Sequence, residues 1–172
     1  MFPFIIIPTG VVIFRLLGAV GVRRFSTLPT SAAHAMALML VITASAHFVP
    51  ASVSAMPNHA DLVAIMPPFV PFPSLVVYAT GVLELLGALG LVMTPTRRLA
   101  GIALAIFFVL VLPANIYAAV ADIRFAGEQA TPLWLRVPEQ LVYIAVALWA
   151  ARSADFSAEE KSGLTEGEAP KH

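Results

Sequence analysis

One apolar stretch in the second half of the chain carries four side chains suited to acid–base or hydrogen-bonding chemistry. They are Arg136, Glu139, Gln140 and Tyr143, spaced i, i+3, i+4 and i+7. This spacing places all four on one face of an α-helix. Ionisable groups near the centre of a bilayer cost at least about 2.5 kcal/mol each, so they turn inward and find partners. The spacing therefore predicts a polar surface inside a helix bundle.

Further polar side chains are expected nearby on neighbouring helices, with Glu84 near mid-membrane and the others toward the outer end. Glu84 follows Gly81 in an apolar stretch, and glycine lets a second helix approach closely. His47 closes an earlier stretch, and Pro113 lacks an N–H, which leaves a helix carbonyl free. We predict a ligand-binding pocket here that opens toward the outer surface. Its residues are His47, Glu84, Asn115, Tyr117, Arg136, Glu139 and Gln140.

Within this pocket we expect Arg136 to pair with Glu84 across two helices. Glu84 is the one acid expected deep in the membrane, and Arg136 is the nearest cation by depth along its helix. A buried charge needs a partner, because breaking a buried pair costs about 3–5 kcal/mol. The alternative is that Arg136 pairs with Glu139 on its own helix or with a lipid headgroup.

The elements that must hold these residues belong to an integral membrane protein. Of the 172 residues, 59% are hydrophobic and 12% are charged, and the mean hydropathy is +0.89. Soluble domains are about 45–50% apolar and about 25% charged. The net charge of zero disfavours a nucleic-acid partner. The absence of cysteine excludes disulfides and thiol chemistry.

Five apolar stretches are long enough, in whole or in part, to cross a bilayer, which takes about 20 residues. They predict an all-α, polytopic transmembrane helix bundle of five spans. The spans cover about residues 4–22, 31–49, 74–93, 99–120 and 133–151. A cleaved signal peptide is the alternative for the first stretch, but its basic pair follows the apolar run instead of preceding it. Residues 153–172 are polar and predict a disordered cytoplasmic tail.

The arginines predict the orientation, because cytoplasmic loops are enriched in basic residues. Arg23 and Arg24, the pair Arg97 and Arg98, and Arg152 all fall on one side of the predicted spans. The opposite loops, 50–73 and 121–132, contain a single basic residue, Arg124. We therefore expect a multi-pass protein of the cell membrane, with its N-terminus outside and its C-terminus in the cytoplasm.

The loop of residues 50–73 is apolar but rich in proline. The segment DLVAIM is expected to form a short helix, with Asp61 favourably placed near its start. The following MPPFVPFP excludes regular helix and should run extended along the mouth of the bundle. Phe69 and Phe72 would then either enter the lipid or cover a cavity, and His59 is expected to be solvated.

Four segments together resemble the DoxX-like membrane proteins. They are AHFVP, the run from DLVAIMPP to TRRLAG, LPANIYAAV and PLWLRVPEQLVYIAVALW, and they lie within about residues 35–150. The combination of IMPP, Gly-x-x-Glu, PANIY and RxPxQ carries the resemblance. It implies a four-helix membrane core to which the first helix is an addition. Some relatives are subunits of quinone-linked oxidoreductases or are associated with redox protection, and most have no assigned activity.

Three classes of function remain open. The leading one is a membrane protein that binds a quinone or another lipid-soluble ligand, as a subunit or accessory of a redox or stress-protection system. The second is a stand-alone enzyme on a lipid substrate, with Glu84 or Glu139 as proton donor. The third is a structural or assembly protein whose polar residues only join helices. We predict no metal site, because nothing fixes the mutual spacing of His47, His59 and Asp61, and no cofactor is evident apart from a quinone.

The orientation can be tested with single cysteines, since the natural chain has none. Cysteines at Ser54 and Gln129 should react with a membrane-impermeant thiol reagent in intact cells, because both loops are expected outside. A cysteine at Thr96 should react only after the membrane is opened. If the cysteine introduced at Thr96 is labelled in intact cells, the orientation is the opposite of the predicted one.

Overall fold

The computed structural model describes residues 2–53, 55–124, 127 and 131–166, and within these ranges the regular structure is entirely helical. The long helices are α1 (Phe2–Ala19), α2 (Leu28–Ser45), α4 (Pro73–Val92), α5 (Arg97–Val120) and α6 (Leu133–Glu166). The short ones are η1 (Arg23–Phe25), α3 (His59–Ala64) and η2 (Thr94–Thr96). Each of the five long helices overlaps one of the five predicted apolar stretches. Ser54 and Gln129 lie outside the described residues.

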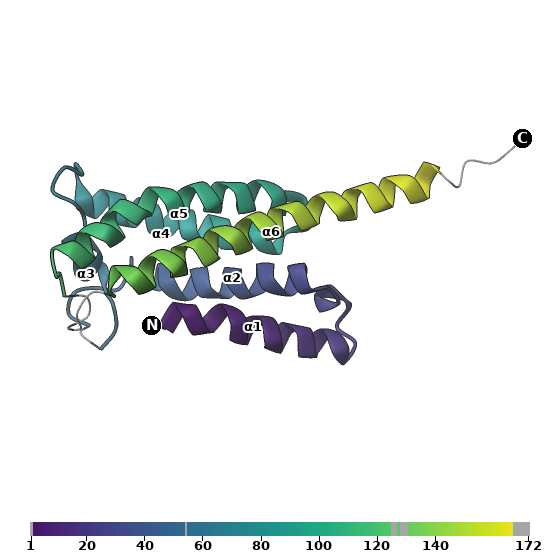
Figure 1. Cartoon of the computed structure of the whole chain (residues 1–172), viewed down its shortest axis with the longest axis horizontal. Coiled ribbons are helices and arrows are strands. Elements are labelled where there is room, and N and C mark those ends of the chain that lie inside the picture. The colour runs from purple at the N-terminus through teal and green to yellow at the C-terminus, as the bar shows by residue number, and fades with distance from the viewer. Residues whose placement is uncertain (1, 54, 125–126, 128–130, 167–172) are drawn as a thin grey trace, which may run out of the picture.

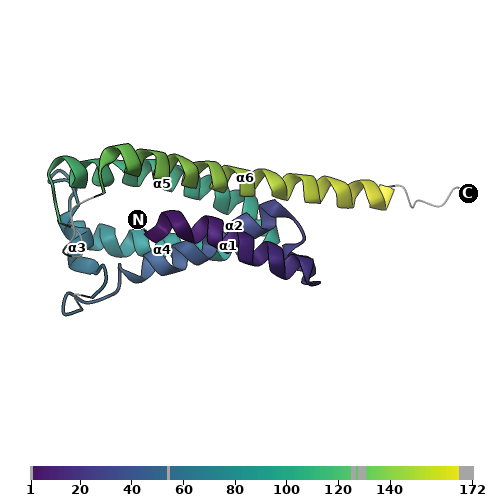
Figure 2. The same ribbon diagram turned by 60° about the horizontal axis from the view of Figure 1, so that its bottom comes forward.

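Four of the helices form a ring. In it α2 packs against α4 and α6, and α5 packs against the same two helices. Helices α4 and α6 therefore lie diagonally across the ring from each other. The remaining long helix, α1, packs on the outside of α2 (Figures 1 and 2).

The centre of the packing is α2, because it contacts α1, α4 and α6 at once. Its buried residues are mostly small or flexible, which allows several helices to approach it. Met36, Met39 and Leu40 are almost fully buried, and alanines occupy most of the remaining contacts. On the outside of the bundle, leucine, isoleucine and valine stay exposed, as Leu16, Leu75 and Leu110 illustrate. An apolar core inside an apolar surface is the arrangement that a lipid environment requires.

Three of the helical segments are long and apolar enough to cross a membrane, namely Leu28–Ser45, Pro73–Val92 and Thr94–Val120. Ile5–Ala19 is an apolar helix too, but it is shorter. Helix α6 does not reach the same hydropathy, because Arg136, Glu139 and Gln140 interrupt its apolar half.

The loop after α2 folds back on the bundle through α3. Asn58 accepts hydrogen bonds from the backbone N–H groups of Ala60 and Asp61, and Asp61 accepts one from the Asn58 N–H. This reciprocal capping box confirms the short helix predicted there. The proline-rich segment after it forms turns and bends, not one extended run. Phe69 and Phe72 are both 77% exposed, which suits an interfacial anchor.

Two arginines close the opposite end of the bundle. Arg24 donates to the Val92 carbonyl at 2.7 Å, and Arg97 donates through Nε to the Leu91 carbonyl at 2.8 Å. These carbonyls end α4, where the helix dipole favours positive charge. Two of the five arginines predicted to share one side of the membrane, Arg24 and Arg97, therefore lie at the same end of the bundle.

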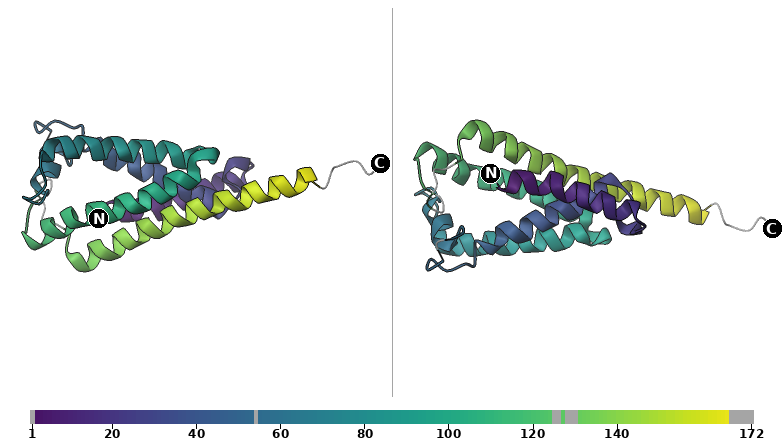
Figure 3. Two further views of the ribbon diagram at one scale, coloured as in Figure 1. Left: turned by 90° about the horizontal axis from the view of Figure 1, so that it is seen from above. Right: turned by 90° about the horizontal axis from the view of Figure 1, so that it is seen from below.

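The tail differs from the expectation of disorder. Helix α6 continues through Glu166 and projects past the other helices (Figures 1 and 3). Alanine, glutamate and lysine are strong helix formers, and no proline or glycine lies between the apolar half, which ends at Ala151, and the sequence AEEK of residues 158–161. Lack of apolar periodicity does not exclude the continuation of an existing helix. Residues 167–172 lie outside the described part.

Two glycines lie at close helix contacts of α5. Gly101 of α5 faces the backbone of α6, and Gly87 of α4 faces a side chain of α5. A Cβ on Gly101 would lie 2.5 Å from the Ala147 carbonyl oxygen in α6, whereas one on Gly87 would meet the flexible Leu104 side chain at 2.5 Å. We expect Gly101→Ala to lower the free energy of unfolding in detergent by about 1–3 kcal/mol, as overpacking does. Gly87→Ala should cost less, because a leucine can change rotamer and a helix backbone cannot move alone. Equal losses would show that the α5–α6 contact also adapts.

Candidate functional site

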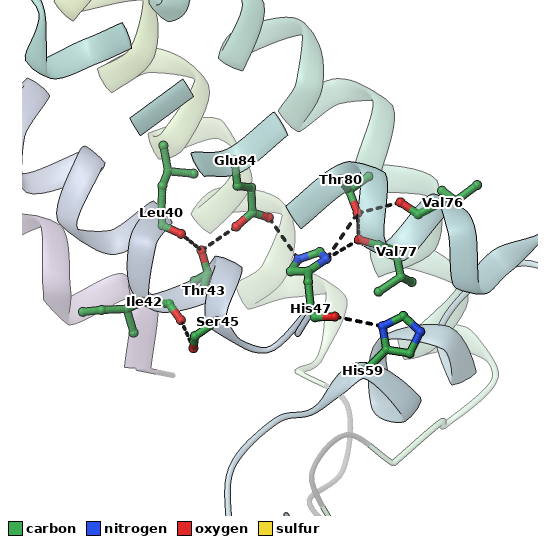
Figure 4. A network of polar contacts seen from close by, with 10 residues as sticks. All are labelled: Leu40, Ile42, Thr43, Ser45, His47, His59, Val76, Val77, Thr80 and Glu84. Atoms are coloured by element: carbon green, nitrogen blue, oxygen red, sulfur yellow. Dashed lines mark hydrogen bonds and ion pairs between the residues drawn. The ribbon is translucent and has the colours of Figure 1, made fainter. Parts of the chain in front are cut away.

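A histidine and a glutamate meet between α2 and α4. His47 lies in the turn that follows α2, and Glu84 lies in the middle of α4. The His47 Nε2 atom is 3.4 Å from Glu84 Oε1, and their side chains are only 8% and 13% exposed. Thr43 donates its hydroxyl to the other carboxylate oxygen, Oε2, at 2.8 Å (Figure 4). The Glu84 carboxylate thus has a partner on each oxygen.

The second ring nitrogen of His47 determines where its proton sits. His47 Nδ1 lies 2.6 Å from the Val77 carbonyl oxygen, which can only accept a hydrogen bond, so Nδ1 carries a hydrogen. Nε2 is then the ring nitrogen that faces the Glu84 carboxylate, 3.4 Å from Oε1.

The close contact between His47 and α4 depends on a glycine. A Cβ on Gly81 would lie 2.5 Å from the Cβ of His47 and 2.7 Å from its Cγ. Such distances do not occur between real atoms, so any larger residue would push the histidine away from Glu84, one turn along the same helix. The Gly-x-x-Glu pattern therefore has a local reason: the glycine admits the histidine that the glutamate binds.

His59 joins this cluster, contrary to the expectation that it is solvated. Its Nδ1 donates to the His47 backbone carbonyl at 2.9 Å, and its Nε2 bonds the Ser74 hydroxyl at 2.9 Å. The ring stacks on Tyr78 with centroids 4.0 Å apart. The loop of residues 50–73 thus places α3 directly over the turn that carries His47. Sequence spacing could not show this, because it depends on how the loop folds back.

A second polar cluster lies on α6. Arg136 Nη1 is 3.2 Å from Glu139 Oε2, and the Tyr143 hydroxyl donates to Glu139 Oε1 at 2.6 Å. Gln140 donates to the Phe108 carbonyl of α5 at 2.7 Å. That carbonyl neighbours the one that loses its helical donor at Pro113. Glu139, Gln140 and Tyr143 are all buried, so the face predicted from their spacing does turn inward.

The expected pair between Arg136 and Glu84 is wrong. Arg136 bonds Glu139 within its own helix, which is the alternative left open by the sequence, and Glu84 bonds His47 and Thr43. The physical reason is the ring: α4 and α6 lie diagonally across it, with α2 and α5 between them. Depth along the helices brought the two residues to a similar level, but depth says nothing about which helices are neighbours.

Two of the predicted residues have no polar contact within the described part of the chain. Asn115 and Tyr117 are half-buried on α5, and neither side chain makes a hydrogen bond there. The seven predicted residues therefore separate into the His47–Glu84 pair, the α6 cluster of Arg136, Glu139 and Gln140, and these two. Thr80 was not predicted, although its spacing of four residues from Glu84 puts it on the same face. Among the described residues, no group of three or more His, Asp or Glu side chains could hold a metal ion.

Comparison with known families gives one match. Residues 36–151 match the family described as Domain of unknown function (DUF8561). The chain belongs to this family. Comparison with curated proteins and with solved structures found no match. The DUF8561 segment begins in α2 and ends in the apolar half of α6, so it comprises the four-helix ring and leaves α1 outside. Both polar clusters of this DUF8561 chain lie within the matched segment.

A cavity of about 430 Å³ lies elsewhere on the DUF8561 ring, between α4 and α5. Its walls are almost entirely apolar, and no predicted ligand-binding residue contributes to them. They include Leu83, Leu86, Leu99, Leu104 and Leu110. A second hollow of about 420 Å³ at the start of α4 is lined by Phe72, Pro73, Ser74, Leu75 and Tyr78. Two of these residues, Ser74 and Tyr78, also contact His59.

The partnership of His47 and Glu84 can be measured with a double-mutant cycle in detergent. We expect His47→Leu and Glu84→Leu each to lower the free energy of unfolding by about 3–5 kcal/mol, because each leaves a buried polar partner uncompensated. The double variant should lose less than the sum of the two.

The control cycle combines Glu84→Leu with Arg136→Met. These losses should add within about 0.5 kcal/mol, because the two residues share no partner. Additivity in the first cycle together with coupling in the second would reinstate the Arg136–Glu84 pair and refute the geometry described above.

Proposed function

We propose that this protein binds a lipid-soluble ligand, such as a quinone, at the His47–Glu84 pair. The single observation that carries the proposal is a buried histidine–carboxylate pair among apolar helices. Ionisable groups at such positions are costly, and they generally mark ligand sites or proton pathways. Glu84 keeps 13% of its side-chain surface exposed, so a ligand head can reach the carboxylate.

The proposal includes a multi-pass arrangement in the cell membrane. We infer five spans, with α6 as the fifth because its polar face turns inward and leaves apolar residues such as Leu141 and Val142 outward. The N-terminus lies outside and the C-terminus in the cytoplasm. The meeting of Arg24 and Arg97 at one end of the bundle supports this orientation, because basic residues are retained on the cytoplasmic side. The His47–Glu84 pair then lies toward the outer surface.

The resemblance to DoxX-like proteins adds the physiological context. We propose that the protein serves as a subunit or accessory of a redox or stress-protection system and that a partner protein supplies the electron chemistry. A stand-alone enzyme on a lipid substrate is the weaker alternative. A structural role is the stronger one, because Thr43, His47 and Glu84 also join α2 to α4, and Gln140 joins α6 to α5.

Ligand binding can be tested by identifying the lipids that accompany the purified protein. We expect mass spectrometry of organic extracts to find a quinone or related lipid in near-stoichiometric amount with the wild type. Glu84→Gln should lose it, because the amide cannot reproduce the carboxylate's contacts with His47 and Thr43.

The matched control is Asp122→Asn, the same carboxylate-to-amide change at an exposed loop residue with a left-handed φ of 49° that asparagine tolerates. It should retain the lipid. If Glu84→Gln folds and keeps the same lipid in the same amount, the ligand does not bind at this pair.

A further inference from the structure

Two arginines lie close together at the end of the bundle opposite α3. Arg24 donates to the Val92 carbonyl at 2.7 Å. Arg97 donates to the preceding carbonyl, that of Leu91, at 2.8 Å. The two guanidinium groups are near enough for their charges to repel each other. Arg97 is only 6% exposed, so its charge is largely withdrawn from water.

A histidine holds Arg24 without changing the charge at this end. His34 Nδ1 lies 2.7 Å from the Thr30 carbonyl oxygen, which can only accept a hydrogen bond, so Nδ1 carries a hydrogen. The Nε–H of Arg24 donates to His34 Nε2 at 2.9 Å, and an arginine can only donate, so Nε2 accepts and carries no hydrogen. The imidazole is therefore neutral, and both arginine charges remain.

The two charges have no counter-anion within the described part of the chain. Neither Arg24 nor Arg97 takes part in an ion pair there. The end of α4 contributes a partial charge of about −0.5, but α5 begins at Arg97 and its start contributes about +0.5, so the two helix ends cancel. A charge that is buried at the end of a membrane bundle needs a partner, because an uncompensated one is costly.

Several N–H groups of the two arginines also lack an acceptor among the described residues. Arg97 uses only Nε, and Arg24 uses Nε and Nη2. This leaves both Nη atoms of Arg97 and the Nη1 atom of Arg24. Every fully buried side-chain nitrogen or oxygen of the described residues has a partner, so these atoms keep access to the surface. Guanidinium donors of this kind match phosphate oxygens in geometry and in charge.

We propose that Arg24 and Arg97 bind the phosphate group of an anionic phospholipid. The surroundings favour a lipid over a free phosphate ion, because Val22, Met93 and Leu99 at this end are apolar and exposed. Basic pockets between the ends of membrane helices are suited to anionic headgroups. This inference goes beyond the proposed function and does not depend on it, since it concerns other residues at the other end of the helices.

The apolar cavity between α4 and α5 supports the lipid as the occupant. It extends to Met93, Thr96 and Leu99, and Thr96 directly precedes Arg97 in the chain. A lipid whose phosphate lies at the arginines can therefore place hydrocarbon against these leucine-rich walls. A zwitterionic lipid fits less well, because its ammonium group would add a positive charge to a site that already has two.

The experiment titrates the purified full-length protein in a neutral detergent with phosphatidylglycerol or with phosphatidylcholine of the same acyl chains. Native mass spectrometry counts the bound lipid. We expect the wild type to bind one phosphatidylglycerol at least about 10-fold more tightly than phosphatidylcholine, because each arginine near an anionic headgroup contributes about 5-fold. Arg24→Gln should weaken the binding of phosphatidylglycerol about 10-fold or more, since it removes a hydrogen-bonded charge.

The matched control is Arg23→Gln, which removes the same charge from the neighbouring exposed residue. It should weaken binding about 5-fold at most, as expected for a charge that acts only through the surface potential. Equal losses in Arg24→Gln and Arg23→Gln would overturn the inference, because they would show adsorption to surface charge in general.

Two further results would overturn the inference with the wild type alone, even if Arg24→Gln does not fold. One is equal affinity for phosphatidylglycerol and phosphatidylcholine. The other is displacement of phosphatidylglycerol by millimolar inorganic phosphate, which would show that the arginines take a free anion. None of these results bears on ligand binding at the His47–Glu84 pair, so the proposed function stands or falls separately.

Discussion

A carboxylate surrounded by apolar helices must have a partner on each oxygen, and much of the local structure around Glu84 meets this requirement. Thr43 and His47 approach it from α2 and from the turn that follows. Gly81 leaves room for the imidazole ring, and the Val77 carbonyl orients it. The loop of residues 50–73 then places His59 against the His47 backbone carbonyl. A chain of local contacts thus runs from the middle of α4 to the outer loop.

The ring of four helices separates the polar groups into two clusters. Because α4 and α6 lie diagonally across the ring, Glu84 and Arg136 do not meet. The Glu84 carboxylate pairs with His47, and the Arg136 guanidinium pairs with Glu139. Arg136 and Tyr143 hold Glu139 within one helix, which joins no two elements. Only Gln140, through the Phe108 carbonyl, ties this face to α5. Of the two clusters, therefore, the His47–Glu84 cluster is the one whose carboxylate is bound by side chains from α2 and from the turn that follows it.

At both ends of the bundle, polar groups satisfy the free backbone groups of helix ends, but the groups differ in kind. At one end the arginines 24 and 97 neutralise the last carbonyls of α4. At the other end a capped short helix, a histidine and a proline-rich turn cover the ring. The apolar surface between the two ends includes the α4–α5 cavity, whose leucine walls suit hydrocarbon and not a polar head.

The sequence by itself determined the helical class, the positions of the long helices and the inward face of α6. These follow from local properties: runs of apolar residues, the 3.6-residue repeat and the cost of charge in an apolar medium. It also indicated that Glu84 and His47 belong to a polar site, because both types are rare in apolar stretches. The tertiary structure decided which polar side chains pair with each other. Whether Glu84 meets His47 or Arg136 depends on which helices are neighbours, and hydropathy and depth are the same for either arrangement. His59 joined the site through the fold of a loop, and α6 extended past its apolar half because helix propensity continues where packing ends.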